Sequence, residues 1–106
     1  MKILLDECVT NDLRSLLAGH EVFTVGFLGW KGTANGALLR LAAGNGFGVL
    51  VTTDQAIKDQ HNESCLILPI VILTASSNHI RSLLPLIPTL LALLQTPLHR
   101  QFYVVP

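Results

Sequence analysis

Apolar runs and amphipathic segments alternate along the chain. Five runs are apolar or β-branched, which is typical of buried strands. They cover residues 2–5, 21–25, 48–53, 68–74 and 102–105. Pro69 falls at the first residues of the fourth run, where a proline removes no ladder hydrogen bond. The pattern therefore predicts five short strands.

Leucine and alanine recur at helical spacing between these runs. The predicted helical faces contain, in chain order, Leu13, Leu16 and Leu17; then Leu38, Leu39, Ala42 and Ala43; then the apolar residues from 79 to about 94. Thr10 or Asn11 can cap the first helix, and Gly19 ends it. Residues 44–46 (Gly-Asn-Gly) end the second helix.

The third helical region carries its own signals for where it starts and bends. Residues 76–78 (Ser-Ser-Asn) can cap it. Pro85 and Pro88 lie inside it, and a proline within a helix removes a backbone donor. We expect this region to be split or kinked at the prolines.

Strands that alternate with helices predict a parallel sheet of four or five strands covered on both faces, joined by right-handed crossovers. The predicted fold is a three-layer α/β/α sandwich. In such folds the second strand lies on one side of the first and the third strand returns to the other side. A crevice then opens beyond the carboxyl ends of the first and third strands. Asp6 and Asp54 are expected to face each other across it.

Length and composition indicate one globular domain. The 106 residues suit a single core, and half of them are apolar while 13% are charged. Such a composition excludes a disordered tail, a coiled coil or a low-complexity scaffold. Seven basic residues balance seven acidic ones, so no basic surface marks a nucleic-acid partner. We expect residues 1–106 to form one domain.

The apolar stretches do not predict a membrane protein. The two longest stretches without a charge, residues 64–80 and 82–98, are interrupted by prolines. The apolar run after Met1 is too short for a signal peptide, and we expect a cytoplasmic protein. Cys8 and Cys65 are expected to be free thiols, with Cys8 buried; two cysteines give neither a disulfide framework nor a structural zinc site.

All seven acidic residues lie in the first 63 positions. Asp6 and Glu7 directly follow the first strand, and Asp54 follows the third. Carboxylates that meet in one crevice repel each other unless a cation balances them. Mg²⁺ or Mn²⁺ fits, because such an ion takes one or two carboxylates and leaves positions for water and phosphate oxygens. Two alternatives stay open: Asp6 or Asp54 caps a helix or turn, and Glu7 points away from Asp6 by strand alternation.

Several segments of the chain resemble a bacterial PIN-like domain family related to the VapC group of toxins. The likeness rests on residues 1–8 (Met-Lys-Ile-Leu-Leu-Asp-Glu-Cys), 19–22 (Gly-His-Glu-Val), 28–30 (Leu-Gly-Trp), 35–36 (Asn-Gly), 38–39 (Leu-Leu), 52–54 (Thr-Thr-Asp), Gln60, Asn62, 77–78 (Ser-Asn) and 83–85 (Leu-Leu-Pro). The family implies a PIN-type fold and a ribonuclease that cleaves RNA phosphodiesters with Mg²⁺ or Mn²⁺. It also implies a toxin component that accompanies a short antitoxin.

The resemblance assigns roles to individual positions. Asp6 would be the central metal ligand, Asp54 the second ligand, and Glu7 a further candidate. Asn35 occupies the place where many PIN nucleases have another acid, so its neutral oxygen implies weaker metal binding. Asp59 either supplies the missing charge or is a solvated acid.

Substrate contacts are expected from residues around the same crevice. The polar candidates are Gln60, Asn62, Ser77 and Asn78. Trp30 is a candidate for stacking on a base, with a partly buried loop anchor as the alternative. Arg14 and Lys31 are the cations nearest in sequence that could contact phosphate, with solvated surface cations as the alternative.

Two other functions stay open. The first is a catalytically weak PIN-like module that binds an antitoxin or a second copy of itself to form a homodimer, for which the apolar segment 83–94 offers a surface. The second is a receiver-like phosphoacceptor domain, which also places acids after the first and third strands. Receivers need a lysine at the end of the fifth strand, and residues 101–106 contain none.

Overall fold

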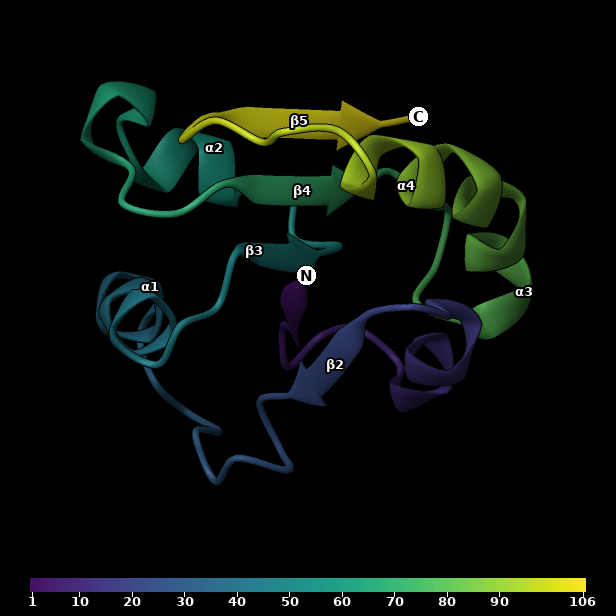
Figure 1. The fold of residues 1–106 in the computed structure, drawn as a ribbon, viewed down its shortest axis with the longest axis horizontal. Helices are drawn as coiled ribbons and strands as arrows, with labels where there is room; N and C mark the ends of the chain where they lie inside the picture. The colour runs from purple at the N-terminus through teal and green to yellow at the C-terminus, as the bar shows by residue number, and fades with distance from the viewer.

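The computed structural model describes all residues 1–106 and contains one parallel sheet in the order β2-β1-β3-β4-β5 (Figure 1). Its strands are β1 (Lys2–Leu5), β2 (Glu21–Thr24), β3 (Val49–Thr52), β4 (Ile70–Leu73) and β5 (Phe102–Val105). All five strand predictions are confirmed, with boundaries one or two residues shorter in three of them. The third strand lies on the far side of β1 from β2, as the sequence predicts.

Short helices connect the strands. The α-helices are α1 (Asn35–Gly44), α2 (Ile57–Gln60), α3 (Ile80–Leu83) and α4 (Ile87–Leu94), and the 3-10 helices are η1 (Asn11–Leu16), η2 (Glu63–Cys65) and η3 (Leu84–Leu86). None of these helices has the length and apolar character needed to cross a membrane.

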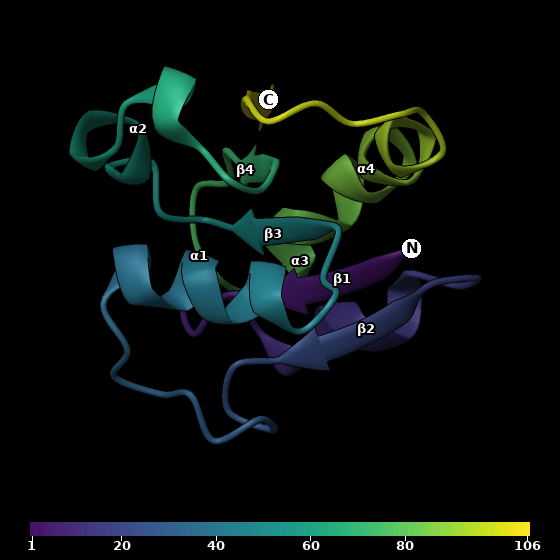
Figure 2. The same cartoon turned by 60° about the vertical axis from the view of Figure 1, so that its left-hand side comes forward.

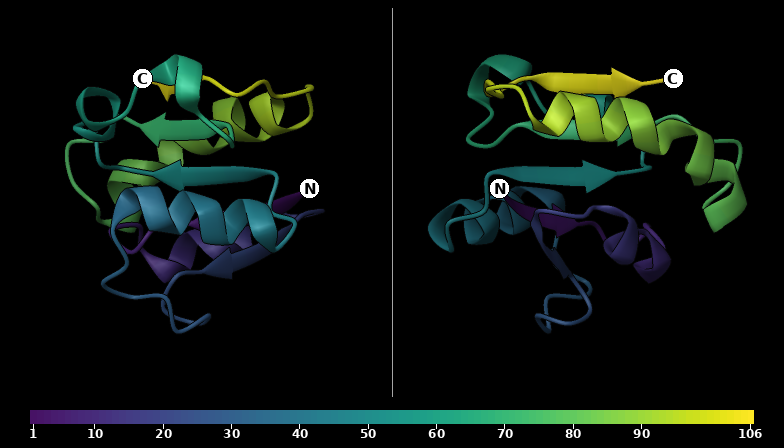
Figure 3. Two further views of the ribbon diagram at one scale, coloured as in Figure 1. Left: turned by 90° about the vertical axis from the view of Figure 1, so that its left-hand side faces the viewer. Right: turned by 45° about the vertical axis from the view of Figure 1, so that its right-hand side comes forward.

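Two helical layers enclose the sheet, so the predicted three-layer sandwich is confirmed. One face carries α1 and α2, whose Leu38, Leu39 and Ile57 pack on Leu4 and Leu50 of the strands. The other face is covered by η1, α3, η3 and α4. Figure 2 shows α1 in front of β1 and β3 with α3 and α4 behind the sheet, and Figure 3 shows the same layers from two further sides. Residues of the central strands β1, β3 and β4 alternate between the two cores and are buried on both faces, whereas the edge strands β2 and β5 are partly exposed.

The crossover from β4 to β5 differs in hand from the other three. The hand of a crossover depends on its direction along the sheet and on the face that it covers. The path from β4 to β5 runs in the same direction as those through α1 and α2, but its helices lie on the opposite face. The prediction of right-handed crossovers throughout is therefore wrong. The physical reason is burial of the apolar side chains on this face of the sheet. The short helix η1 covers only part of the face, and α4 covers the remainder with Ile87, Leu90 and Leu94.

The first predicted helix forms as a 3-10 helix. Thr10 caps it, since its side chain accepts a hydrogen bond from the backbone N–H of Asp12 at 3.3 Å. Gly19, with φ of +85°, turns the chain toward β2. The 3-10 helix takes six of the fifteen residues that connect β1 to β2.

The third helical region is divided at its prolines, as predicted, but its cap differs. His79 caps α3 by accepting a hydrogen bond at Nδ1 from the N–H of Arg81 at 3.2 Å. Ser77 instead accepts from the N–H of His79 and pairs with Ser82, so the predicted cap at residues 76–78 is wrong by one residue. Pro88 lies in the first turn of α4, where its missing N–H has no intrahelical partner to lose.

Candidate functional site

Two aspartates follow adjacent strands at the carboxyl edge of the sheet. Strands β1 and β3 pair in parallel with Leu5 opposite Val51, so the residues that follow them emerge side by side. Asp6 and Asp54 line one cleft of about 590 Å³, which we call the Asp54 cleft. Its lining consists of Asp6, Glu7, Cys8, Thr33, Asn35, Thr53, Asp54 and Asn78. The predicted meeting of Asp6 and Asp54 is confirmed.

Thr52 forms a hydrogen bond with each of the two aspartates. It is the last residue of β3 and is fully buried. Its hydroxyl donates to Oδ2 of Asp6 at 2.8 Å and accepts from the backbone N–H of Asp54 at 3.0 Å. One buried group therefore fixes the Asp6 carboxylate and the backbone from which Asp54 projects. The sequence signal for this role is a threonine at the end of an otherwise apolar strand; the resemblance included Thr52 but assigned it no role.

Each aspartate also holds its own local turn. Oδ1 of Asp6 accepts the N–H of Glu7 at 2.8 Å, and the Cys8 thiol lies 3.8 Å from Oδ2. Cys8 is half-buried, so the expectation of a buried thiol is wrong: the residue lines the cleft, where its sulfur accepts a hydrogen bond from the Thr53 hydroxyl at 3.2 Å. Oδ1 of Asp54 accepts a hydrogen bond from the N–H of Ala56 at 3.0 Å. Asp54 therefore caps a turn, which was one of the two roles that the sequence left open for it. A carboxylate oxygen can accept more than one hydrogen bond, so both aspartates keep further acceptor capacity.

Glu7 has a specific structural contact. Its Oε1 accepts the backbone N–H of Gly32 at 2.9 Å, although the two residues are 25 positions apart. Gly32 has φ of +78°, a conformation that glycine adopts without a side-chain penalty. The exposed Glu7 carboxylate thus holds the loop between β2 and α1 against the end of β1.

The amide candidates divide into two groups. Asn35, the first residue of α1, donates from Nδ2 to Oε1 of Gln60 at 3.1 Å, which places Gln60 beside the Asp54 cleft. Asn78 lines this cleft, but the neighbouring Ser77 does not. Asn62 caps η2 and lines a separate cavity of about 230 Å³.

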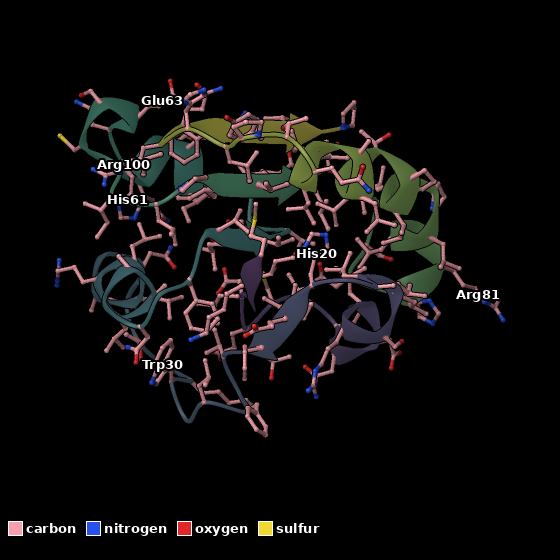
Figure 4. All side chains as sticks on the ribbon, in the orientation of Figure 1. His20, Trp30, His61, Glu63, Arg81 and Arg100 are labelled. Carbon is pink, nitrogen blue, oxygen red and sulfur yellow. The ribbon has the colours of Figure 1, made fainter.

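Two further candidates lie away from the Asp54 cleft. Trp30 is half-buried, and its ring meets Phe47 edge-on with 6.0 Å between centroids. Figure 4 shows Trp30 on the loop near α1, which matches the loop-anchor alternative. Asp59 is exposed on α2 and lines no cavity, as expected of a solvated acid.

The donor set of the Asp54 cleft suits a hard cation. Its three carboxylates come from Asp6, Glu7 and Asp54, and no lysine or arginine lines it. No group of three or more His, Cys, Asp or Glu side chains is close enough together to bind a metal on its own. Asp6 and Asp54 carry oxygen ligands of the type that Mg²⁺ and Mn²⁺ take, and such an ion needs only one or two protein carboxylates beside water.

Comparison with known proteins adds no family to this geometry. No family model, curated protein or solved structure matches the chain. The chemistry of the site therefore rests on its own residues.

Proposed function

We propose that this chain is a Mg²⁺- or Mn²⁺-dependent ribonuclease of PIN type, acting as the toxin of a toxin–antitoxin pair. One observation carries the catalytic part: two aspartates from adjacent parallel strands share a cleft that contains no basic side chain. Within the Asp54 cleft no basic side chain balances the carboxylates, which favours a divalent cation there, and such a cation favours phosphate oxygens. The toxin role and the antitoxin partner follow from the sequence resemblance to PIN-like proteins.

The protein's own groups prepare this site. Asp6 and Asp54 would hold the ion, and the buried hydroxyl of Thr52 keeps the Asp6 carboxylate in one orientation. Asn35 supplies a neutral oxygen at the cleft while Gln60 orients its amide. A divalent ion bound there would supply positive charge to a phosphodiester and make bound water more acidic. Fixed ligands of this kind reduce the reorganisation that hydrolysis requires.

A receiver function has some support from topology and less from the site. The strand order is shared with receiver-type doubly wound folds. However, β5 and the residue after it contain no lysine. The hydroxyl of Thr74, directly after β4, donates to the carbonyl of Val105 at 2.8 Å, so its hydrogen is already bound to the neighbouring strand β5.

A purely binding role through the apolar segment 83–94 has weaker support. Leu83, Leu86, Ile87, Leu90 and Leu94 are in the core. Leu84 is the one large apolar side chain of this segment that is exposed. The segment therefore leaves little apolar surface for an antitoxin or a second copy.

RNA cleavage by variants of the two aspartates tests the proposal. Single-stranded and structured RNA are incubated with purified protein, with and without Mn²⁺, alongside Asp6→Asn, Asp54→Asn and the exposed control Asp59→Asn. We expect Mn²⁺-dependent cleavage by the wild type and by Asp59→Asn, and loss of about a hundredfold or more in both cleft variants. Equal cleavage by all four proteins, or by none, would overturn the nuclease assignment.

A further inference from the structure

A second cleft adjoins the carboxylates on the β2 side. It has a volume of about 600 Å³, within the usual range for small-molecule sites, and we call it the Arg14 cleft. Its lining consists of Asp6, Glu7, Val9, Thr10, Asn11, Arg14, Thr24, Val25, Gly26, Phe27 and Lys31. Asp6 and Glu7 line both clefts, so the two spaces meet at the end of β1.

Of the two cations of the Arg14 cleft, Arg14 is held by a backbone hydrogen bond and Lys31 lies over a glycine. The Nε of Arg14 donates to the carbonyl of Val22 at 3.0 Å, which fixes the guanidinium and leaves its terminal nitrogens for a ligand. Lys31 crosses Gly26 so closely that a Cβ built at Gly26 would lie 3.1 Å from its Cε. The absence of a side chain at Gly26 therefore lets the lysine lie over the cleft.

Phe27 provides an aromatic surface in the same place. Its side chain is 69% exposed, the highest value among the large apolar residues. The backbone N–H of Phe27 is bound to the Thr24 hydroxyl at 3.0 Å, and its ring centroid lies 6.1 Å from that of Phe23. Arg14 lies 5.8 Å from the Phe27 centroid, so a cation and an exposed ring occur together.

We propose that the Arg14 cleft binds one nucleotide of single-stranded RNA, with its phosphate at Arg14 and Lys31 and its base on Phe27. This inference rests on the proposed ribonuclease function, and it names the subsite next to the scissile phosphate. Exposed aromatic rings beside cations are the usual means of holding single strands without reading sequence. Phe27 replaces Trp30 as the stacking residue, because the Trp30 ring packs on Phe47 and lies outside both clefts.

Glu7 serves this subsite through the loop. Its bond to the N–H of Gly32 holds the residue next to Lys31 at the end of β1. The loop that carries Phe27 and Lys31 is thereby placed relative to Asp6. Glu7 is a positioning residue in this proposal.

Equilibrium binding of an RNA that is not being cleaved tests the subsite. Fluorescence anisotropy follows a labelled oligouridylate of about eight nucleotides in EDTA, over a series of salt concentrations. We expect Phe27→Leu to weaken binding about tenfold, because leucine keeps the apolar contact but removes the flat ring. We expect Lys31→Gln to lower the slope of log K against log salt by about 0.7, the loss of one phosphate contact.

Lys58→Gln is the matched control, because Lys58 is exposed on α2 and lines no cavity. The proposal is overturned if the wild type does not bind this RNA, or if Lys58→Gln equals Lys31→Gln in slope. It is also overturned if Phe27→Leu binds as tightly as the wild type. If the wild type binds RNA but does not cleave it, and both Phe27→Leu and Lys31→Gln weaken binding, the subsite is supported and the ribonuclease function is rejected. If the wild type cleaves RNA and neither variant changes binding, the ribonuclease function is supported and the subsite is rejected.

Discussion

Replacing Thr52 with valine removes the hydroxyl that connects the two aspartates and keeps the side-chain volume. The fully buried Thr52 loses a bond of 2.8 Å to the Asp6 carboxylate and one of 3.0 Å from the N–H of Asp54. A hydrogen bond to a charged group contributes about 1.5–3 kcal/mol, and the Asp54 N–H regains part of its loss from water in the cleft. We expect Thr52→Val to lower the free energy of unfolding by about 2 kcal/mol.

Urea denaturation measures this loss. With a slope of roughly 1.5 kcal/mol per molar urea for a chain of this size, the midpoint should fall by about 1.3 M. Thr52→Ser keeps the hydroxyl and is the control; it should lose less than half as much, since it lacks only the methyl group. If Thr52→Val and the wild type unfold at the same midpoint, the hydroxyl does not hold the site together and the reasoning fails.

Two further pairs of variants test the backbone and the core. Gly32→Ala should lower the free energy of unfolding by about 1–2 kcal/mol, because φ is +78° at this residue. Gly44→Ala, within α1, should raise it by up to about 1 kcal/mol. Thermal unfolding measures both changes, and equal shifts in the midpoint would contradict the backbone conformations of the two glycines. Leu90→Ala should lower the free energy of unfolding by about 2–5 kcal/mol because the Leu90 side chain is fully buried. Leu84→Ala should lower it by less than about 1 kcal/mol, because Leu84 is 46% exposed. Similar losses for the two variants in chemical denaturation would contradict the packing of α4 on the sheet.

The strands were predictable because they form uninterrupted apolar runs, and in the central strands β1, β3 and β4 these runs are buried on both faces of the sheet. The runs 2–5 and 102–105 match the observed boundaries of β1 and of the partly exposed edge strand β5. The hand of the last crossover was not predictable from local pattern. It depends on which face of the sheet the apolar side of α4 covers, and the residue pattern within one helix does not say which face that is.

The candidate site was predictable where backbone topology decides it. Asp6 and Asp54 meet because each follows a strand and the two strands are neighbours. Side-chain contacts between distant surface segments were not predictable in this way. The bond from Gly32 to Glu7 and the passage of Lys31 over Gly26 depend on the course of a loop, which has no periodic signal.

Manganese binding tests most directly whether Asp6 and Asp54 share a divalent ion. Titration of the protein with Mn²⁺, followed by the electron paramagnetic resonance of the free ion, gives the affinity of each variant. The account predicts saturable binding by the wild type, a loss of at least about tenfold in both Asp6→Asn and Asp54→Asn, and no change in Asp59→Asn. Absence of binding in the wild type, or equal affinity in all the proteins, would contradict a shared metal site between β1 and β3.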